Sequence, residues 1–365
     1  MQQNIGRSRR KVGQRSKELS KHLSPKIGLL VSLIFIICTV VLMVHWPVLS
    51  AQALSFDDDM YLTENLLVQN PGWASTEQFL TEVLEPSTVG GYYQPLTMIS
   101  LMLDYTMGGH SDNLMPFHCT SLALHIVNTA LVIVLLYLLF GRAWVAAGVG
   151  LLFGLHPMTV ETVAWVGERK TLLAAFFALW SLILYVRFTR KSNWSLYFGS
   201  MVMYVLALMS KPTSTPLPVL MLLMDYWPLE RWKRRGFWEK LPFFIIGGIF
   251  AIITYVSQSR TAFAVLPDKY CTEHIGLVLC HNIIFYLYKI IWPVNLSSHY
   301  AFPEPLALSD PMVLIGVIGT CILIPLLLIS LRWTRGILIG WLFFFGDPIF
   351  NEFANWLSES LLEVG

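Results

Sequence analysis

The chain has 365 residues, of which 55% are hydrophobic and only 13% are charged. Soluble domains usually carry about 25% charged residues, so this composition excludes an ordinary soluble protein and indicates a multi-pass membrane protein. The net charge of +2 carries little information, because the basic and acidic residues lie in different parts of the chain. We expect an all-α fold, a bundle of about nine or ten transmembrane helices of roughly 20 residues each.

The amino-terminal 26 residues are strongly basic and contain a single acidic residue, Glu18. The basic residues are Arg7, Arg9, Arg10, Lys11, Arg15, Lys17, Lys21 and Lys26. Basic segments beside a membrane span stay on the cytoplasmic side, so we expect residues 1–26 to form a cytoplasmic arm that contacts anionic lipid rather than nucleic acid. The apolar run from Ile27 to Leu49 is too long for a signal peptide and lacks a small-residue cleavage site, which predicts a retained first span.

The segment 50–115 is predicted to be a long first extracytoplasmic loop. No Lys or Arg occurs from Pro47 to Phe140, and a loop without basic residues belongs outside. Acidic residues are frequent there, namely Asp57, Asp58, Asp59, Glu64, Glu77, Glu82, Glu85, Asp104 and Asp112. The stretch from Pro95 to Met107 repeats its apolar residues at helical spacing but is too short to cross a bilayer, which predicts a helix in the membrane interface.

The following apolar runs predict closely spaced membrane helices within a membrane domain of residues 27–345. The expected spans are 116–140, 143–157, 171–188, 194–210, 213–228, 241–257 and 312–331, with a last one beginning near Gly336. Basic residues occupy alternate turns, which places those turns in the cytoplasm and keeps the topology consistent. For the run 276–292 we expect an interfacial or re-entrant segment rather than a crossing. Residues 346–365 form a short polar tail.

The five cysteines show no metal-binding spacing. Cys38, Cys119 and Cys321 lie in apolar runs and are predicted to be small buried residues. Cys271 and Cys280 fall in a segment placed outside the membrane, where they either form a disulfide or remain free thiols.

The acidic triplet Asp57, Asp58 and Asp59 lies just beyond the first span. Adjacent carboxylates raise one another's pKa, which keeps part of such a cluster basic enough to accept a proton. From the triplet alone, two readings stay open, a solvated acidic turn and a functional carboxylate cluster at the membrane surface.

The triplet belongs to the first of five ordered motifs. They are Phe56 to Asn65; Tyr93-Gln94-Pro95-Leu96-Thr97 with Leu103-Asp104; His156-Pro157 through Glu161, Trp165 and Glu168-Arg169-Lys170; Lys211-Pro212 with Asp225-Tyr226-Trp227-Pro228-Leu229; and Lys289 to Pro293 with Tyr300 and Pro303. Together they resemble membrane glycosyltransferases of the GT-C class, nearest to the bacterial relatives of the transmembrane-and-tetratricopeptide-repeat O-mannosyltransferases. The chain departs from the pattern at Thr171, where relatives commonly have Asp, and it lacks the helical repeats. We therefore expect either a truncated gene product or a membrane core that acts without repeats.

The resemblance implies that a sugar is transferred, with inversion, from a polyprenyl-phosphate carrier to a hydroxyl of a protein or glycan acceptor. The expected location is the extracytoplasmic face of the cell membrane. Such a reaction needs a base for the acceptor hydroxyl and cations for the leaving phosphate. Asp57 first, then Asp58, match the acidic motif and are expected to supply the base, or the ligands of a divalent metal if one is used. Asp59 is expected either to share this role or to cap the following helix.

The resemblance also implies a set of substrate-binding residues. Arg169, Lys170 and Lys211 are expected to bind the carrier phosphate; the alternative is that they snorkel to the interface. His156 is expected to orient the acceptor or to end a helix.

Tyr93 and Gln94 are expected to line a sugar or acceptor cleft or to belong to an aromatic belt. Glu161 is expected to support the site by pairing with Arg169. His118 and His125 share a helix face and are expected to form hydrogen bonds between helices.

Two other classes of protein compete with the enzyme. A secondary transporter would place its acidic residues in the middle of the spans and show two similar halves. Here the expected spans contain few carboxylates and no internal repeat is visible. A non-catalytic membrane assembly protein that keeps the fold is the third alternative.

Overall fold

The computed structural model describes residues 27–52, 58–83, 93–231, 234–261, 275–297, 300, 303 and 306–342. Within these residues every named element is a helix, which confirms the all-α prediction. The basic arm, Asp57, Cys271 and the polar tail lie outside the described residues.

The helices follow one another with short connections. The first half contains a helix over 27–45, η1 (Trp46–Ser50), α2 (Asp58–Leu62), α3 (Leu66–Gln69), α4 (Trp73–Thr81), α5 (Pro95–Thr106), α6 (Met115–Phe140), α7 (Ala143–Leu155), α8 (Thr159–Ala164), η3 (Val166–Glu168) and α9 (Arg169–Lys191). The second half contains α10 (Trp194–Ser210), η4 (Pro212–Ser214), α11 (Leu217–Tyr226), α12 (Arg234–Trp238), α13 (Leu241–Thr261), α14 (Ile275–Ile291), α15 (Pro311–Ser330) and a helix over 335–342.

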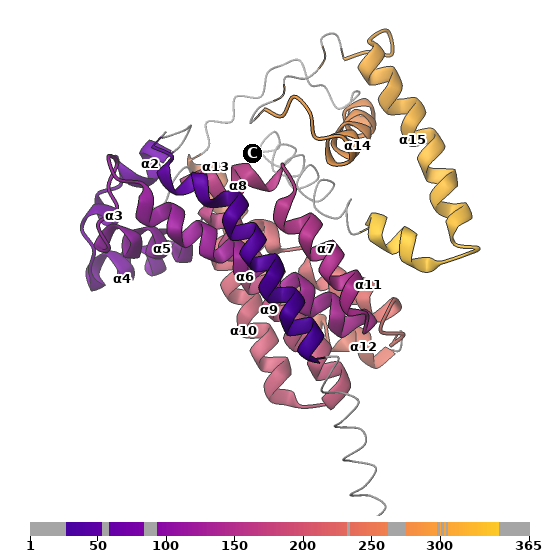
Figure 1. Ribbon diagram of the computed structural model, residues 1–365, viewed down its shortest axis with the longest axis horizontal. Helices are drawn as coiled ribbons and strands as arrows, with labels where there is room; N and C mark the ends of the chain where they lie inside the picture. Colours follow the sequence, from indigo (N-terminus) through magenta and orange to yellow (C-terminus); the bar gives the residue numbers. More distant parts are fainter. Residues whose placement is uncertain are drawn as a thin grey trace, which may run out of the picture.

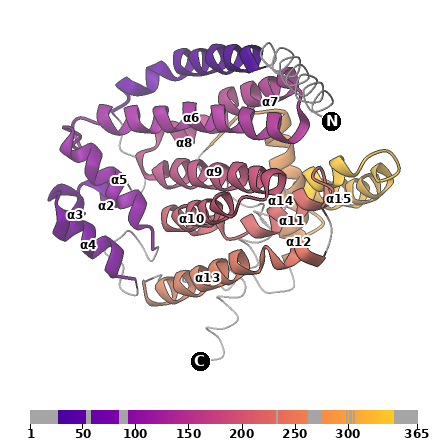
Figure 2. The ribbon, with the colours of Figure 1, turned by 90° about the horizontal axis from the view of Figure 1, so that it is seen from below.

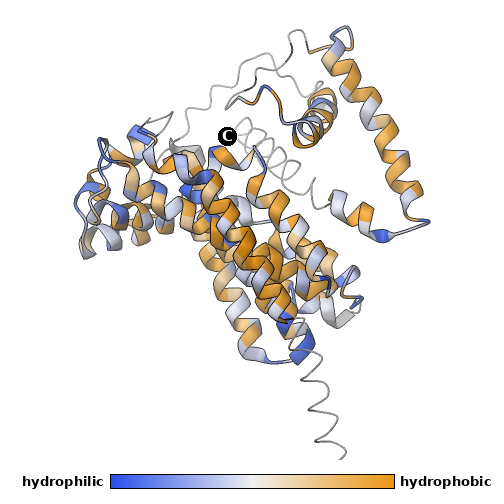
Figure 3. Ribbon diagram, viewed as in Figure 1, coloured by the Kyte–Doolittle hydropathy of each residue, from blue (hydrophilic) through white to orange (hydrophobic). Residues whose placement is uncertain are grey.

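Five of these helices are long and apolar enough to cross a membrane, which supports the multi-pass class. They are Ile27–Ser50, Met115–Phe140, Val166–Lys191, Gly236–Ser257 and Pro311–Ser330, and three shorter apolar helices accompany them, Ala143–Leu155, Trp194–Ser210 and Gly276–Ile291. In Figure 3 hydrophobic residues run along the bundle helices and hydrophilic residues gather at the bundle's ends. The expected total of nine or ten spans stays a prediction.

The bundle is built around one apolar core. Helices α6, α9, α10 and α13 run side by side (Figure 2), and α11 completes the packing. The centre of this core is formed by buried residues such as Leu135, Val186, Tyr204, Met221 and Phe243. Because each helix contributes residues three or four positions apart, the buried residues form a continuous stripe on each helix.

Helices α2 to α5 form a small layer at one end of the bundle, seen on the left of Figures 1 and 2. We call this layer the cap. Its own core includes Val68, Phe79, Met98 and Leu101, and it continues into the bundle through Phe117 of α6. Thr97 of α5 also donates a hydrogen bond to the last carbonyl of α10, with 2.9 Å between Oγ1 and the Ser210 oxygen. The cap is therefore fixed to the bundle by both apolar and polar contacts.

Close helix packing depends on small residues at α7. A Cβ added at Gly150 would lie 2.2 Å from Cγ1 of Ile133 on α6, so only glycine allows this approach. Next to it, His125 of α6 donates a hydrogen bond to the Gly154 carbonyl at 3.0 Å. His118 bonds the Ala51 carbonyl at 3.2 Å. The predicted hydrogen bonding of these two histidines across the bundle is confirmed.

Two expected spans differ from the structure. The segment 213–228 contains only η4 and the ten-residue α11, about 15 Å long at 1.5 Å per residue and too short to cross a bilayer. Prolines at positions 212, 216, 218 and 228 limit the helix, because proline lacks the backbone donor of a helix interior. For the run 276–292, α14 is a continuous helix, which Figure 1 shows almost end-on while α15 lies in the plane. Its placement in the membrane interface stays a prediction.

The cysteine predictions need correction as well. Cys119 and Cys321 are exposed on the outside of their helices, and only Cys38 is partly buried. An exposed position on a membrane helix faces lipid, where a thiol is as acceptable as it is in a core. Cys280 is a free thiol within α14, and its expected partner at 271 lies outside the described residues.

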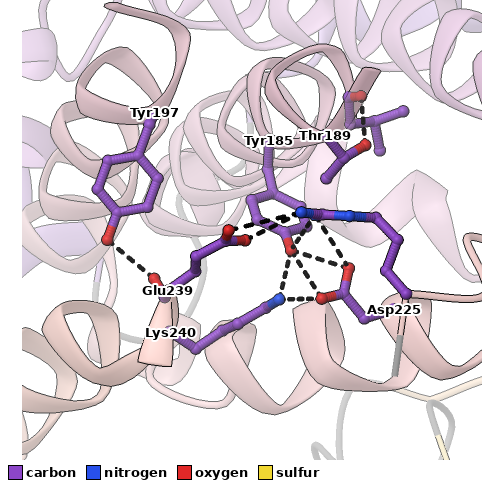
Figure 4. A network of polar contacts seen from close by, with 8 residues as sticks. Tyr185, Thr189, Tyr197, Asp225, Glu239 and Lys240 are labelled. Atoms are coloured by element: carbon purple, nitrogen blue, oxygen red, sulfur yellow. Dashed lines mark hydrogen bonds and ion pairs between the residues drawn. The ribbon is translucent and has the colours of Figure 1, made fainter. Parts of the chain in front are cut away.

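A buried ionic network holds the other end of the bundle together (Figure 4). Asp225 of α11 is 1% exposed and contacts the ammonium of Lys240, while the hydroxyl of Tyr185 donates to both Asp225 oxygens at 2.8 and 2.9 Å. Arg231 lies 3.9 Å from Asp225 and 3.3 Å from Glu239. Tyr185 lies about 24 Å along α9 from Arg169, so this network is remote from the cap.

Candidate active site

Asp58 is the member of the acidic triplet whose role the structure reveals most directly. It lies in the first turn of α2, is 1% exposed, and its Oδ1 accepts a hydrogen bond of 2.7 Å from the backbone N–H of Gly167. A Cβ on Gly167 would lie 3.1 Å from that oxygen, so the close approach favours glycine. Asp58 thus joins the cap to the turn that precedes α9.

Tyr61 follows Asp58 by three residues and therefore lies on the same face of the short helix. Its hydroxyl oxygen accepts a hydrogen bond from the Gln94 amide at 2.8 Å and another from the Lys170 ammonium at 3.2 Å. The Tyr61 ring also lies 5.2 Å from Lys170 Nζ, and the Trp165 ring lies 5.7 Å from it. These contacts fix the position of the Lys170 ammonium. Sequence analysis missed Tyr61, although its helical spacing from Asp58 was a usable signal.

Lys170 and Lys211 approach one another through Glu168, and we call these three residues the lysine cluster. Glu168 Oε1 lies 3.6 Å from Lys170 Nζ, and Oε2 lies 3.7 Å from Lys211 Nζ. Thr171 donates its hydroxyl hydrogen to Glu168 Oε2 and accepts a 2.8 Å hydrogen bond from Lys211. Sequence analysis singled out the two lysines but did not identify Glu168 or Thr171 as their partners.

Arg169 occupies a different environment from the expected surface position. Its side chain is 0% exposed and forms an ion pair with Asp104 of the cap, with 2.7 Å between Nη1 and Oδ2. Its remaining donors bind the hydroxyls of Ser100 and Ser121 and the carbonyl of Phe117. The expected pairing of Arg169 with Glu161 is therefore wrong. With its hydrogen-bonding atoms engaged by protein groups, Arg169 connects α5, α6 and α9.

Tyr93 and Gln94 are buried, at 7% and 1% exposed. Gln94 orients Tyr61, and the Tyr93 hydroxyl donates a 3.1 Å hydrogen bond to the Leu80 carbonyl of α4. Burial raises the pKa of Tyr93 above its usual value, so its hydroxyl stays protonated. In this structure both residues support the cap from within, and a role in lining a cleft stays a prediction.

His156 connects the bundle to α14. Its Nδ1 accepts a hydrogen bond from the backbone N–H of Met158, so Nε2 carries the proton and donates to the Ile290 carbonyl at 3.0 Å. The ring thus ends α7 and also fixes the end of α14. Glu161 is exposed on α8, and partial burial together with the carboxylate of Glu168 raises its pKa. Glu161 and the lysine cluster therefore interact electrostatically.

The described residues contain no group of three or more His, Cys, Asp or Glu side chains that would hold a metal ion. Of the two carboxylates expected to bind a metal, Asp58 has one oxygen engaged by Gly167, and Asp57 lies outside the described residues.

One end of the bundle thus combines a pair of cations with the acidic segment of the first loop. The side chains of Lys170, Lys211 and Glu168 are 16%, 26% and 17% exposed, so a molecule from outside can contact them. Ammonium groups at such a site bind anionic oxygens, phosphate above all. Asp58 and Tyr61 position these cations beside the start of α2.

Comparison with known proteins identifies distant homologues of one kind. The chain is 35% identical over 102 residues to the protein O-mannosyl-transferase Tmtc2 of Drosophila melanogaster, an alignment that covers 27% of this chain and 11% of that protein. It is 30% identical over 156 residues to the human protein O-mannosyl-transferase TMTC4, covering 38% of this chain and 21% of that protein. For human TMTC2 the identity is 29% over 154 residues, covering 40% and 18%.

The alignments thus span about a tenth to a fifth of these relatives' own length. No family model and no solved structure matches the chain. The chain is therefore distantly similar, over part of its length, to protein O-mannosyl-transferases.

Proposed function

We propose that this protein is a membrane glycosyltransferase of the GT-C class. It transfers a sugar from a polyprenyl-phosphate carrier to a hydroxyl of a protein or glycan acceptor on the extracytoplasmic face. The observation that carries the proposal is the approach of Lys170 and Lys211, from two different helices, to one partly exposed position below the cap. The similarity to protein O-mannosyl-transferases supports the class of reaction.

The two lysines suit the leaving group. When the bond between sugar and phosphate breaks, negative charge develops on the phosphate oxygen, and cations already in place stabilise that charge without rearranging. The aromatic rings of Tyr61 and Trp165 hold Lys170, and Thr171 holds Lys211. Both lysines belong to the membrane bundle, so a carrier whose apolar chain lies in lipid can place its phosphate beside them.

The acceptor hydroxyl requires a base, and we assign that role to Asp57. Asp58 is poorly suited, because it is buried and one of its oxygens accepts the Gly167 hydrogen bond. Asp59 is exposed and accepts a hydrogen bond from the Thr63 hydroxyl at 3.0 Å, which is a local contact within the first loop. Attack by the activated hydroxyl on the face opposite the phosphate would invert the sugar's configuration.

An activity assay with matched aspartate variants tests the proposal. Purified full-length protein in nanodiscs would be incubated with radiolabelled polyprenyl-phosphate sugars and a panel of peptide and glycan acceptors. Asp57→Asn should reduce turnover by about 10²–10⁴-fold, the usual loss when a general base is removed. Asp59→Asn, the same chemical change two residues away, should have little effect. No transfer from any carrier, or a greater loss in Asp59→Asn than in Asp57→Asn, would contradict the assignment.

A further inference from the structure

The carboxylate of Glu168 lies where an anionic ligand of the lysine cluster would bind. Its two oxygens are shared between Lys170 and Lys211, at 3.6 and 3.7 Å. We propose that Glu168 is an internal counter-anion that occupies the phosphate position of the empty site and leaves it when the donor binds. This inference rests on the proposed function and adds a residue that controls how tightly the carrier phosphate is held.

The geometry indicates that the carboxylate can be displaced. Charge-assisted hydrogen bonds between ammonium and carboxylate groups are usually about 2.7–2.9 Å long, and both ion pairs are clearly longer. A single planar carboxylate therefore contacts the two ammonium groups only loosely. A tetrahedral phosphate has more oxygens, spread in three dimensions, and can form a short hydrogen bond to each lysine. Because all three side chains are partly exposed, phosphate can enter and the Glu168 side chain can turn towards water.

Thr171 defines the position to which the carboxylate returns. Its hydroxyl donates to Glu168 and accepts from Lys211 at 2.8 Å, so it holds both partners from the first turn of α9. Lys170 is held independently by Tyr61. The two lysines therefore keep their places while Glu168 moves, and the empty cluster does not collapse when its anion is exchanged.

A competing carboxylate matters most after sugar transfer. The donor is a phosphodiester with one negative charge, and cleavage of the bond to the sugar leaves its electron pair on the phosphate oxygen. The product is a monoester with a charge of about −1.5 to −2 at neutral pH, which two lysines bind more tightly than the donor. Repulsion from Glu168 offsets this gain and so favours release of the product.

The test is to measure binding of farnesyl phosphate, a short polyprenyl phosphate, to the full chain in phosphatidylcholine nanodiscs. Glu168→Gln keeps the shape of the side chain and removes its charge, and should tighten binding about tenfold, or ~1.4 kcal/mol. Glu168→Asp, whose shorter side chain cannot contact both lysines, should tighten it less, by about threefold, or ~0.7 kcal/mol. Glu77→Gln, the same change at an exposed residue of α4, serves as the control and should bind as the parent does.

Unchanged or weaker binding in both Glu168 variants would overturn the inference and make Glu168 a residue that positions the lysines. Inorganic phosphate as a second ligand separates this result from the proposed function, because it has neither a polyprenyl chain nor a sugar. If Glu168→Gln tightens inorganic phosphate but no protein binds farnesyl phosphate, the counter-anion is supported and the carrier assignment fails. If farnesyl phosphate binds the parent and both variants alike, the carrier assignment is supported and the counter-anion fails.

Discussion

Arg169 and Lys170 are neighbours on the first turn of α9, but their side chains point to different surroundings. One is fully buried against Asp104, and the other is 16% exposed beside Tyr61. Successive residues on a helix are rotated by about 100°, so a pair of adjacent cations at a bundle end divides between interior and surface. The two residues therefore contribute to different properties, Arg169 to stability and Lys170 to ligand binding.

Variants of these two residues should separate the properties. Arg169→Ala leaves Asp104 as an unpaired buried charge and should lower the free energy of unfolding by about 3–5 kcal/mol. Lys170→Ala should leave stability almost unchanged and weaken farnesyl phosphate binding by about 1.5–3 kcal/mol, the range for hydrogen bonds to charged groups. Thermal unfolding in detergent and ligand titration measure the two effects.

Matched variants distinguish a buried pair from a general loss of packing. Arg169→Met with Asp104→Leu removes both charges and should recover much of the stability lost in Arg169→Ala. Lys191→Ala removes a lysine from the opposite end of α9 and should not change phosphate binding. If Arg169→Ala unfolds like the parent, Arg169 is not the structural cation described above.

Glu161 should make stability depend on pH. Partial burial and then the Glu168 carboxylate raise the pKa of Glu161 above its ordinary value of 4.5. A raised pKa means that the folded state binds the proton more tightly, so the stabilising contribution is complete below about pH 4.5 and is lost as the pH rises through the raised value. Glu161→Gln should flatten this decline. Melting temperatures of the parent, Glu161→Gln and Glu77→Gln between about pH 4 and 7 check it; identical curves would argue against the shift.

At the level of helices, the long apolar elements were predictable and the short ones were not. The expected spans 116–140 and 312–331 agree closely with α6 and α15, because about 20 consecutive apolar residues have few alternatives to a helix. The segment 213–228 is equally apolar, but its prolines confine the helix to ten residues. Apolar composition therefore predicts burial, and the length of each helix depends on where backbone donors are missing.

The candidate site shows the same limit. Motifs identified Asp58, Gln94, Lys170 and Lys211 as site residues, and the structure brings them to one end of the bundle. The partners of these residues were not predictable, because each is set by the packing of separate helices. Arg169 illustrates this point, since spacing along one helix suggested Glu161 as its partner and packing between helices supplied Asp104.

The network around Asp225 should anchor α11 to α13. Lys240→Met removes the cation that contacts the buried carboxylate of Asp225, so the free energy of unfolding should fall by about 3–5 kcal/mol. Because this network is remote from the lysine cluster, the folded fraction should bind farnesyl phosphate normally. Chemical denaturation followed by ligand titration tests both statements, with Lys191→Met as an exposed control. Loss of phosphate binding without loss of stability would contradict this structural role.

For the whole molecule, the two ends of α9 should lie on opposite sides of the membrane. The helix has 23 residues and extends about 34 Å, enough to cross the hydrocarbon core. Single cysteines at Met158 and Tyr300 should react with an impermeant maleimide added outside intact cells, and one at Lys191 should react only after permeabilisation. The background protein would have its native cysteines replaced by serine. Labelling of Tyr300→Cys only from inside would reverse the placement of α14.

The hydrogen bond between Asp58 and Gly167 also has a consequence for how the protein is made. Gly167 follows Asp58 by 109 residues, and Arg169 follows Phe117, which it also binds, by 52. During synthesis the first loop is therefore translocated long before the residues that neutralise Asp104 and engage Asp58 leave the ribosome. Until α9 is inserted, the cap has to remain open, with both carboxylates in water. Insertion of α9 is then the step that closes the cap, brings Lys170 under Tyr61, and lets the protein become resistant to proteases at its outer surface.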